Sequence, residues 1–230
     1  MPKGNIYLVP TVLHEEALHT IPNYVHEITE AIEIFFVEDE RTARRYLRKS
    51  GYKKSFDEII MLRIDEQNIS ECIHYLLQGK DVAILSEAGV PTVADPGADI
   101  VKLAHQTDIR VIPLIGPSSV LLALMASGFN GQQFSFKGYL PIKSAERKAA
   151  IKQLEQKLLQ TGETQIFIET PYRNNALIED VIEVCNNSTL FCIAANLTGP
   201  DEYVKTKSIA EWKQQKLHLE KIPVIFLLGN

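Results

Sequence analysis

The sequence predicts a two-lobed α/β protein, with a mostly parallel sheet in the N-terminal lobe and a mixed sheet in the C-terminal lobe. Short apolar runs alternate with amphipathic segments in the first half of the chain, which is typical of parallel strands joined by helices. Strand patterns outnumber helix patterns in the second half. At 230 residues and 45% apolar content, the chain can bury one large core or two small ones.

In the first half, the expected strands are apolar runs and the expected helices carry their apolar side chains on one face. A helix over 39–49 should end near Gly51. A second helix should begin at Asn68, with Glu71 placed for a capping box. Asp95 should cap a helix over 96–106, because proline suits the first helical position that follows it. The expected strands are 6–10, 33–38, 82–86 and 111–115.

In the second half, we expect an apolar helix, a charged amphipathic helix and a third helix, over 118–127, 144–159 and 172–185. Ser208 and Glu211 match a capping box for a short fourth helix. The expected strands are 133–139, 165–169, 190–196, 203–208 and 224–228. Because the alternation of strands and helices changes after residue 114, we expect lobes over 1–114 and 115–230, with a cleft between them.

Composition narrows the classes of function. The net charge of −5 argues against nucleic-acid binding through bulk positive charge, although a local basic patch remains compatible with it. Three widely separated cysteines in apolar patterns indicate buried free thiols and a reducing compartment. No signal-peptide pattern opens the sequence, and the uncharged stretch 111–136 holds too many prolines and glycines for a spanning helix. We therefore expect a cytoplasmic protein with no membrane contact.

The stretch Ser86-Glu87-Ala88-Gly89-Val90-Pro91, continued to Gly97, is the most informative motif. It lies between an expected strand and an expected helix, at the strand's carboxyl end. Glycines let the backbone approach a ligand, and the first N–H groups of a helix are ready donors. Open α/β sheets bind ligands at such loops, so we expect a binding loop here, with a plain turn as the alternative.

Two further motifs also follow expected strands. Gly116-Pro117-Ser118-Ser119 could line a small-molecule pocket, or one serine could simply cap the next helix. At the end of the second strand, Glu38 and Arg41 could contact substrate. Alternatively, this charged segment is only a solvated helix start, where acidic side chains favour the helix dipole.

The segment Glu169-Thr170-Pro171-Tyr172-Arg173 also ends a strand and opens a helix. Arg173 could pair with a phosphate, and Tyr172 could stack on a base. The alternative is structural, with Thr170 as a cap and Pro171 in the first helical position.

Several familiar sites are absent from the sequence. It contains no G-x-G-x-x-G, P-loop, H-E-x-x-H or G-x-S-x-G motif, and neither its cysteines nor its six histidines have metal-ligand spacing. We therefore expect no metal, and most hydrolase, metalloenzyme and Rossmann-type interpretations are excluded.

The motifs occur in a fixed order over nearly the whole chain: Leu8-Val9-Pro10-Thr11, Glu38-Asp39-Glu40-Arg41, the glycine loop with Asp95-Pro96-Gly97, Pro113-Leu114-Ile115-Gly116-Pro117-Ser118, Lys137-Gly138-Tyr139-Leu140-Pro141 and Glu169-Thr170-Pro171-Tyr172-Arg173. This order resembles the tetrapyrrole methylase superfamily. The resemblance is closest to the branch that methylates a cytidine ribose 2′-hydroxyl in small-subunit ribosomal RNA.

The resemblance implies a homodimeric two-lobed fold that binds S-adenosylmethionine in the cleft between the lobes. The implied partner is ribosomal RNA or the small ribosomal subunit. By motif match, the donor-binding residues are Pro10, Ser86, Ala88, Gly89, Gly116, Pro117 and Ser118. The chain departs from the family pattern in its first loop, where Val12-Leu13-His14 replaces a Gly-Asn element, and at Glu87, where aspartate is usual. An arginine–glutamate pair that the family tends to have near 194–198 is also absent.

Methyl transfer to a ribose hydroxyl requires positioning and a general base. The first candidate for the base is Glu87, followed by Glu38, and Asp95 also qualifies. We expect substrate contacts from Arg41, Asp95, Tyr172 and Arg173. Two alternatives remain open at this point: a precorrin-type C-methyltransferase acting on a tetrapyrrole, and a catalytically degenerate module that binds donor or RNA.

Overall fold

The computed structural model describes residues 2–219 and 221–230. The chain divides into two compact units, the first ending at Ser118 and the second beginning at Ser119. Each unit contains one five-stranded sheet and its own hydrophobic core.

The sheet of the first unit is entirely parallel, as the sequence predicts. Its strand order is β3-β2-β4-β1-β5, and every neighbouring pair runs in the same direction. The carboxyl ends of all five strands therefore meet at one edge. The strands are β1 (Ile6–Val9), β2 (Ile34–Val37), β3 (Ile60–Arg63), β4 (Val82–Leu85) and β5 (Val111–Pro113).

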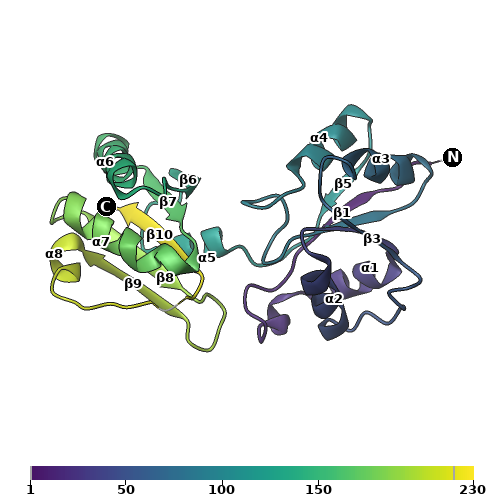
Figure 1. The fold of residues 1–230 in the computed structure, drawn as a ribbon, viewed down its shortest axis with the longest axis horizontal. Helices are drawn as coiled ribbons and strands as arrows, with labels where there is room; N and C mark the ends of the chain where they lie inside the picture. The colour runs from purple at the N-terminus through teal and green to yellow at the C-terminus, as the bar shows by residue number, and fades with distance from the viewer. Residues whose placement is uncertain (1, 220) are drawn as a thin grey trace. The chain divides into compact units, whose positions relative to one another are not determined.

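Helices cover both faces of this sheet (Figure 1). One face packs against α1 (Asn23–Ala31) and α2 (Glu40–Lys49), and the other against α3 (Ile69–Leu77) and α4 (Ala98–Gln106). The strands are buried on both sides because alternate residues point to opposite faces: Phe35 joins the core under α1 and α2, and Phe36 joins the core under α3 and α4. A short 3-10 helix, η1 (Leu18–Thr20), precedes α1.

The sheet of the second unit is mixed, which confirms the prediction. Its order is β6-β7-β10-β8-β9; β6 and β7 are parallel, and the other neighbours are antiparallel. The strands are β6 (Phe134–Tyr139), β7 (Thr164–Ile168), β8 (Leu190–Ala195), β9 (Tyr203–Ser208) and β10 (Val224–Gly229).

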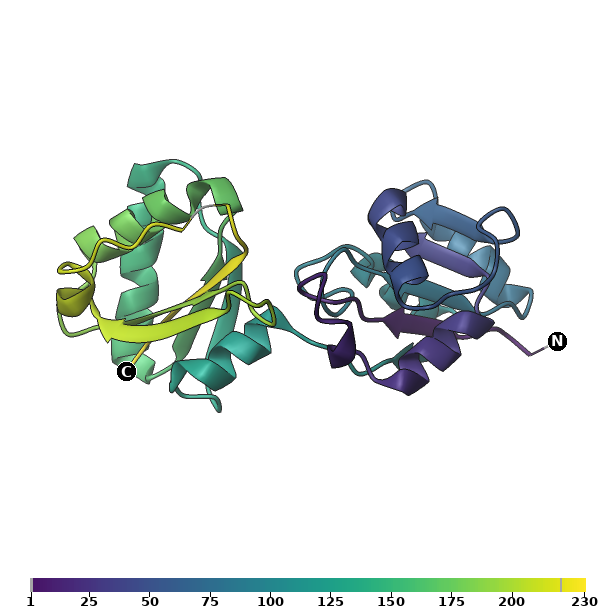
Figure 2. The ribbon, with the colours of Figure 1, turned by 90° about the horizontal axis from the view of Figure 1, so that it is seen from below.

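Two helices, α6 (Ser144–Thr161) and α7 (Asn174–Val184), pack on one face of this sheet, and α5 (Ser119–Ser127) packs on the other (Figures 1 and 2). The short helix α8 (Ile209–Trp212) buries Trp212 against Phe191. A buried ion pair joins α6 to α7, because Arg147 Nη2 lies 2.6 Å from Asp180 Oδ2.

Two of the predicted helix caps are wrong and one is confirmed. Asp95 does not cap α4, since the helix begins at Ala98 with Gly97 in the cap position and no capping side chain. The predicted capping box of α3 is also absent; instead, Glu71 accepts a hydrogen bond from the Tyr75 hydroxyl at 2.8 Å. The capping box of Ser208 and Glu211 is present as predicted.

The sequence pattern missed α1, η1 and β3. The helix expected over 172–185 also starts later: a 3-10 turn, η2 (Pro171–Arg173), precedes α7. All three cysteines are buried free thiols, as expected, and burial raises the pKa of Cys72 and of Cys185 to about 12. Within the described residues, no helix is long and apolar enough to cross a membrane, and no group of three His, Cys, Asp or Glu side chains is arranged to hold a metal.

Candidate active site

The loops that follow β1 and β4 are joined by hydrogen bonds. The backbone N–H of Thr11 donates to the carbonyl of Gly89 at 2.8 Å, and the Thr11 hydroxyl donates to the carbonyl of Ser86 at 3.3 Å. Thr11 and Ser86 are both buried. The hydroxyl of Tyr46, on α2, donates to the carbonyl of Pro10 at 3.0 Å and anchors the first loop from the other side. The glycine loop is therefore attached to a rigid part of the sheet edge.

Two glycines allow the loops after β1, β4 and β5 to approach each other closely. Gly89 has a φ of +80°, and a Cβ there would lie 3.0 Å from Leu13 Cδ2 and 3.1 Å from the carbonyl oxygen of Pro117. A Cβ on Gly116 would lie only 2.1 Å from Pro10 Cβ. The structure thus brings together four of the predicted donor-binding residues, from three separate loops of the first unit.

The other predicted donor-binding residues belong to the same loops. Ala88 is exposed between Glu87 and Gly89, Ser86 is buried, and Ser118 is the last residue of the first unit. The hydroxyl of Ser86 donates to the carbonyl of Gly89 at 3.2 Å, which tightens the turn of the glycine loop.

The glycine loop also contains backbone strain. Thr92 and Ala94 have φ values of +69° and +67°, in the left-handed region that L-residues other than glycine seldom adopt. Such strain persists only where the surrounding structure enforces it, and it gathers at binding and catalytic loops. The strain therefore supports the interpretation of this loop as functional rather than as a plain turn.

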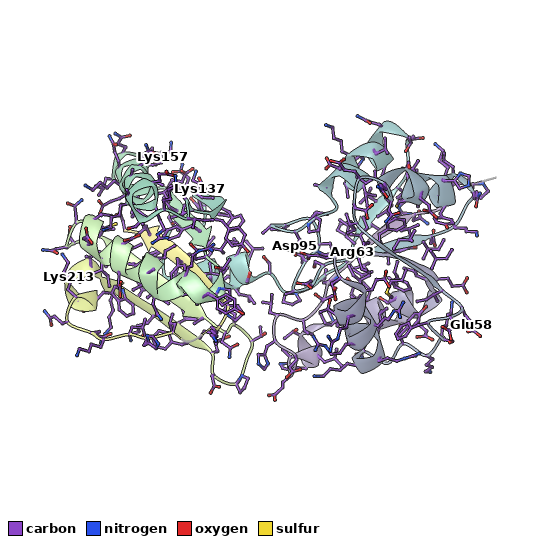
Figure 3. All side chains as sticks on the ribbon, in the orientation of Figure 1. Glu58, Arg63, Asp95, Lys137, Lys157 and Lys213 are labelled. Carbon is purple, nitrogen blue, oxygen red and sulfur yellow. The ribbon has the colours of Figure 1, made fainter. Side chains whose placement is uncertain are left out.

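Three carboxylates from two loops gather at the same sheet edge. Glu38 follows β2, while Glu87 and Asp95 lie in the loop after β4. The backbone N–H of Glu87 donates to Glu38 Oε2 at 3.4 Å, and the Thr42 hydroxyl donates to Glu87 Oε1 at 3.4 Å. Figure 3 labels Asp95 in this loop and Arg63 at the end of β3.

Burial and the neighbouring negative charges raise the pKa of two of these carboxylates, Asp95 and Glu38. Burial raises the pKa of Asp95 to about 6, and the negative charges of Glu38 and Glu87 add to this effect, while a hydrogen bond with Ser86 opposes it. Burial and the charge of Glu87 also raise the pKa of Glu38. Glu87 itself is exposed. The pKa of Asp95 is therefore raised toward neutral pH.

The segment from Glu38 to Thr42 has the structural role that the sequence left open, the start of a capped helix, while substrate contact by Glu38 and Arg41 stays a prediction. Asp39 caps α2, because its Oδ1 accepts a hydrogen bond from the backbone N–H of Thr42 at 2.9 Å. That bond lowers the pKa of Asp39. Arg41 is exposed in the first turn of α2, three residues after Glu38 in the chain. The helix start is thus capped, while Glu38 and Arg41 remain available at the sheet edge.

Tyr172 and Arg173 lie in the second unit, apart in sequence from the loops of the first. The Glu169 side chain is fully buried, and its Oε1 accepts hydrogen bonds from Arg173 Nη2 at 2.7 Å and from the N–H of Thr170 at 2.6 Å. The Thr170 hydroxyl does not cap η2, although Pro171 does occupy the first turn. Tyr172 is 80% exposed, and Lys221 Nζ lies 5.7 Å from its ring centroid.

Sequence reasoning missed the role of Glu169 as the partner of Arg173. An acid four residues before an arginine at the start of a helix is the signal that could have found it. Several buried polar atoms around this pair have no hydrogen-bond partner among the described residues: Glu169 Oε2, Thr170 Oγ1, Arg173 Nε and Asn174 Oδ1.

No protein-family model matches the chain, but the individual proteins that it resembles share one name. The chain is 30% identical over 210 residues to Ribosomal RNA small subunit methyltransferase I of Escherichia coli O157:H7, covering 91% of this chain and 71% of that protein. It is 30% identical over 216 residues to the protein of the same name from Haemophilus influenzae, covering 91% and 72%. The protein of that name from Thermotoga maritima is 32% identical over 170 residues, covering 73% and 72%.

Proposed function

The chain belongs to the family of Ribosomal RNA small subunit methyltransferase I, and from this premise we propose that it methylates the 2′-hydroxyl of a cytidine ribose in small-subunit ribosomal RNA. The methyl donor is S-adenosylmethionine. One observation on this chain supports the proposal. The loops after β1, β4 and β5 meet through residues that are expected to hold the donor, namely Pro10, Gly89, Gly116 and Pro117.

The residues at this edge fit the donor in charge. A side chain at Gly89 or Gly116 would collide with a neighbouring loop, so these glycines allow the three loops to meet. S-adenosylmethionine carries a positive sulfonium and an ammonium group, and the three carboxylates nearby favour cations. The residues that would hold it are those predicted by the motif match: Pro10, Ser86, Ala88, Gly89, Gly116, Pro117 and Ser118.

The bound donor supplies a methyl group that is already activated by the positive sulfur. The protein must place the ribose oxygen in line with that methyl group, and such positioning is worth roughly 7–11 kcal/mol. As the new carbon–oxygen bond forms, the hydroxyl loses its proton, and a carboxylate of the site must accept it. A correctly placed base contributes about 10²–10⁴-fold to the rate.

Among the three carboxylates, Asp95 fits this role best. A general base works best when its pKa lies near the working pH, and the pKa of Asp95 is about 6. We therefore propose Asp95 as the group that receives the proton. Burial is the main cause of the raised pKa of Asp95; Glu38 and Glu87, which sequence reasoning placed first, add to it and favour the cationic donor.

We propose that Arg41 in the first unit, and Tyr172 and Arg173 in the second, contact the RNA. Arg41 is exposed in the first turn of α2 and can pair with a phosphate. Tyr172 is exposed enough to stack on a base, and Glu169 holds the Arg173 guanidinium in one place. We also propose that the active form is a homodimer, which sedimentation of the purified chain would test, and that it acts in the cytoplasm.

Calorimetric titration with S-adenosylmethionine tests the donor site, and methyl transfer to small ribosomal subunits that lack this methyl group tests the acceptor. We expect micromolar donor binding, about −8 kcal/mol, and transfer to the RNA. Donor binding with transfer to a tetrapyrrole instead would support the C-methyltransferase alternative. A folded protein that binds no donor would support the degenerate-module alternative.

A further inference from the structure

Helix α2 carries a concentration of positive charge in a chain whose net charge is −5. Five of its ten residues are arginine or lysine, and only Glu40 is acidic. The five cationic residues are Arg41, Arg44, Arg45, Arg48 and Lys49. A local excess of positive charge attracts anionic partners.

Two of these side chains are engaged in holding the structure. Arg44 pairs with Glu40 across one helical turn, at 3.1 Å. The guanidinium of Arg48 lies 4.2 Å from the ring centroid of Phe56 and donates hydrogen bonds to the carbonyls of Tyr52 and Lys54. Arg44 and Arg48 therefore stabilise the helix and the segment that follows it.

The other three side chains form an unpaired row. Arg41, Arg45 and Lys49 are exposed, and no ion pair or hydrogen bond of their side chains occurs within residues 2–219 and 221–230. Residues four apart lie on the same face of a helix, about 6 Å apart along its axis. The buried residues Ala43 and Leu47 lie on the opposite side, so the row faces solvent.

We propose that Arg41, Arg45 and Lys49 bind successive phosphates of one RNA strand and guide it to the carboxyl edge of the first sheet. This inference rests on the proposed function, since it assigns a path to that RNA. Arg41 stands in the first turn of α2, just after Glu38 at the site, and the row leads away from the site along the helix. The axial step of about 6 Å is similar to the phosphate spacing of an extended strand.

The local charges favour RNA over the other anions that a basic helix could bind. Arginine binds phosphate in a planar, bidentate manner, and two of the three residues are arginines. The carboxylates Glu38, Glu87 and Asp95 repel phosphates from the donor loops, so the backbone of a bound strand is directed to the row while the ribose enters the site. None of the three side chains in the row is apolar, so the row has nothing to insert into a lipid surface. The aromatic side chain on the same helix, Tyr46, is held by a hydrogen bond to the carbonyl of Pro10.

The test compares two double variants with the same change in net charge. Arg45→Gln with Lys49→Gln removes two members of the row and leaves Arg41 in place. Lys102→Gln with Lys152→Gln is the control, because both lysines are exposed and lie on α4 and α6. Affinity for a small-subunit RNA fragment that contains the methylation site is measured between about 50 and 200 mM salt, with S-adenosylmethionine affinity measured in parallel.

The row variant should bind RNA more weakly, and its plot of log affinity against log salt should be shallower by about 1.4, or 0.7 for each lost contact with single-stranded RNA. Its KM for RNA should rise while its donor affinity stays that of the wild type. The control variant should keep the wild-type slope. The proposal would be overturned if the row variant kept the affinity and salt slope of the wild type. It would also be overturned if the row variant lost binding to anionic vesicles but not to RNA. The proposed function fails separately if wild-type protein binds RNA through the row but transfers no methyl group.

Discussion

The carboxylate of Glu38 accepts a hydrogen bond from the backbone N–H of Glu87 at 3.4 Å, and so connects the end of β2 to the loop after β4. This contact keeps two negative side chains near each other and near Asp95. Burial first, and then the repulsion between these charges, raises the pKa values of Glu38 and Asp95. A cationic methyl donor would relieve the repulsion, which explains how an acidic site can be stable when occupied.

Methyl transfer should depend on pH through Asp95. Because a base must be ionised, the rate should rise with pH as Asp95 loses its proton, with a midpoint near its pKa of about 6, and then level off. Asp95→Asn should lower the plateau by about 10²–10⁴-fold. The measurement is kcat/KM for the donor across this pH range, because kcat/KM reports the pKa of the free enzyme.

The control for this prediction is Asp99→Asn, since Asp99 is exposed in the first turn of α4. It should retain both the rate and the pH midpoint. If Asp95→Asn left the pH profile of the wild type intact, Asp95 would not be the base, and Glu87→Gln and Glu38→Gln would be examined next.

The same carboxylate should influence the stability of the fold. Burial raises the pKa of Asp95 from 3.8 to about 6, so the folded state binds its proton more tightly than the unfolded state does. The stability that this group contributes is therefore present below about pH 4 and is lost as pH rises to about 6. Asp95→Asn should match the wild type at pH 4 and have a larger free energy of unfolding at pH 7, measured by urea denaturation. A wild-type advantage at pH 7 would contradict the raised pKa.

Gly89→Ala should weaken donor binding and destabilise the first unit. The left-handed backbone costs an L-residue about 1–2 kcal/mol, and the new Cβ would press on Leu13 and on the carbonyl of Pro117. Gly128→Ala is a matched control, because Gly128 has the same φ of +80° with nothing within 4 Å of its Cβ. Only Gly89→Ala should reduce affinity for S-adenosylmethionine in calorimetry, and equal effects on donor affinity would remove Gly89 from the site.

Arg173→Ala should destabilise the second unit as well as weaken RNA binding. The partner Glu169 is fully buried, so removal of the guanidinium leaves an unpaired buried carboxylate, at a cost of about 3 kcal/mol. The double variant Glu169→Gln with Arg173→Gln removes both charges and should recover most of this stability. It should still bind RNA more weakly than the wild type, with unchanged donor affinity. Wild-type RNA affinity in the double variant would show that Arg173 is only structural.

Most of the fold could be predicted from hydrophobic periodicity, and the missed elements have physical explanations. Helix α1 starts after Pro22 with no capping side chain, and one of its two buried positions is a threonine, so its apolar face is weak in the sequence. Strand β3 is an edge strand of four residues, and none of its residues is fully buried. The prediction that Asp95 caps α4 was wrong because the chain turns at Gly97, which has a φ of +114°, and the helix begins only after it. Residue propensities do not predict the position of this turn.

The candidate site could be predicted only as a set of strand ends. Parallel strands place Pro10, Glu38, Ser86 and Gly116 at one edge whatever the details. The sequence could not show that Thr11 bonds to Gly89, or that Asp95 becomes the most perturbed carboxylate, because both depend on loops far apart in the chain. The row on α2 has a regular spacing of four, and a count of charges at the helical period would have found it.

Methyl transfer to a cytidine ribose in small-subunit RNA is best tested by following the methyl group itself. Purified protein is incubated with methyl-labelled S-adenosylmethionine and small ribosomal subunits that lack this modification, and the RNA is digested and analysed by mass spectrometry. The expected product is a labelled 2′-O-methylcytidine that is absent when the protein is omitted. Label on a base atom or no label in the RNA, from folded protein that binds the donor, would contradict the proposed function.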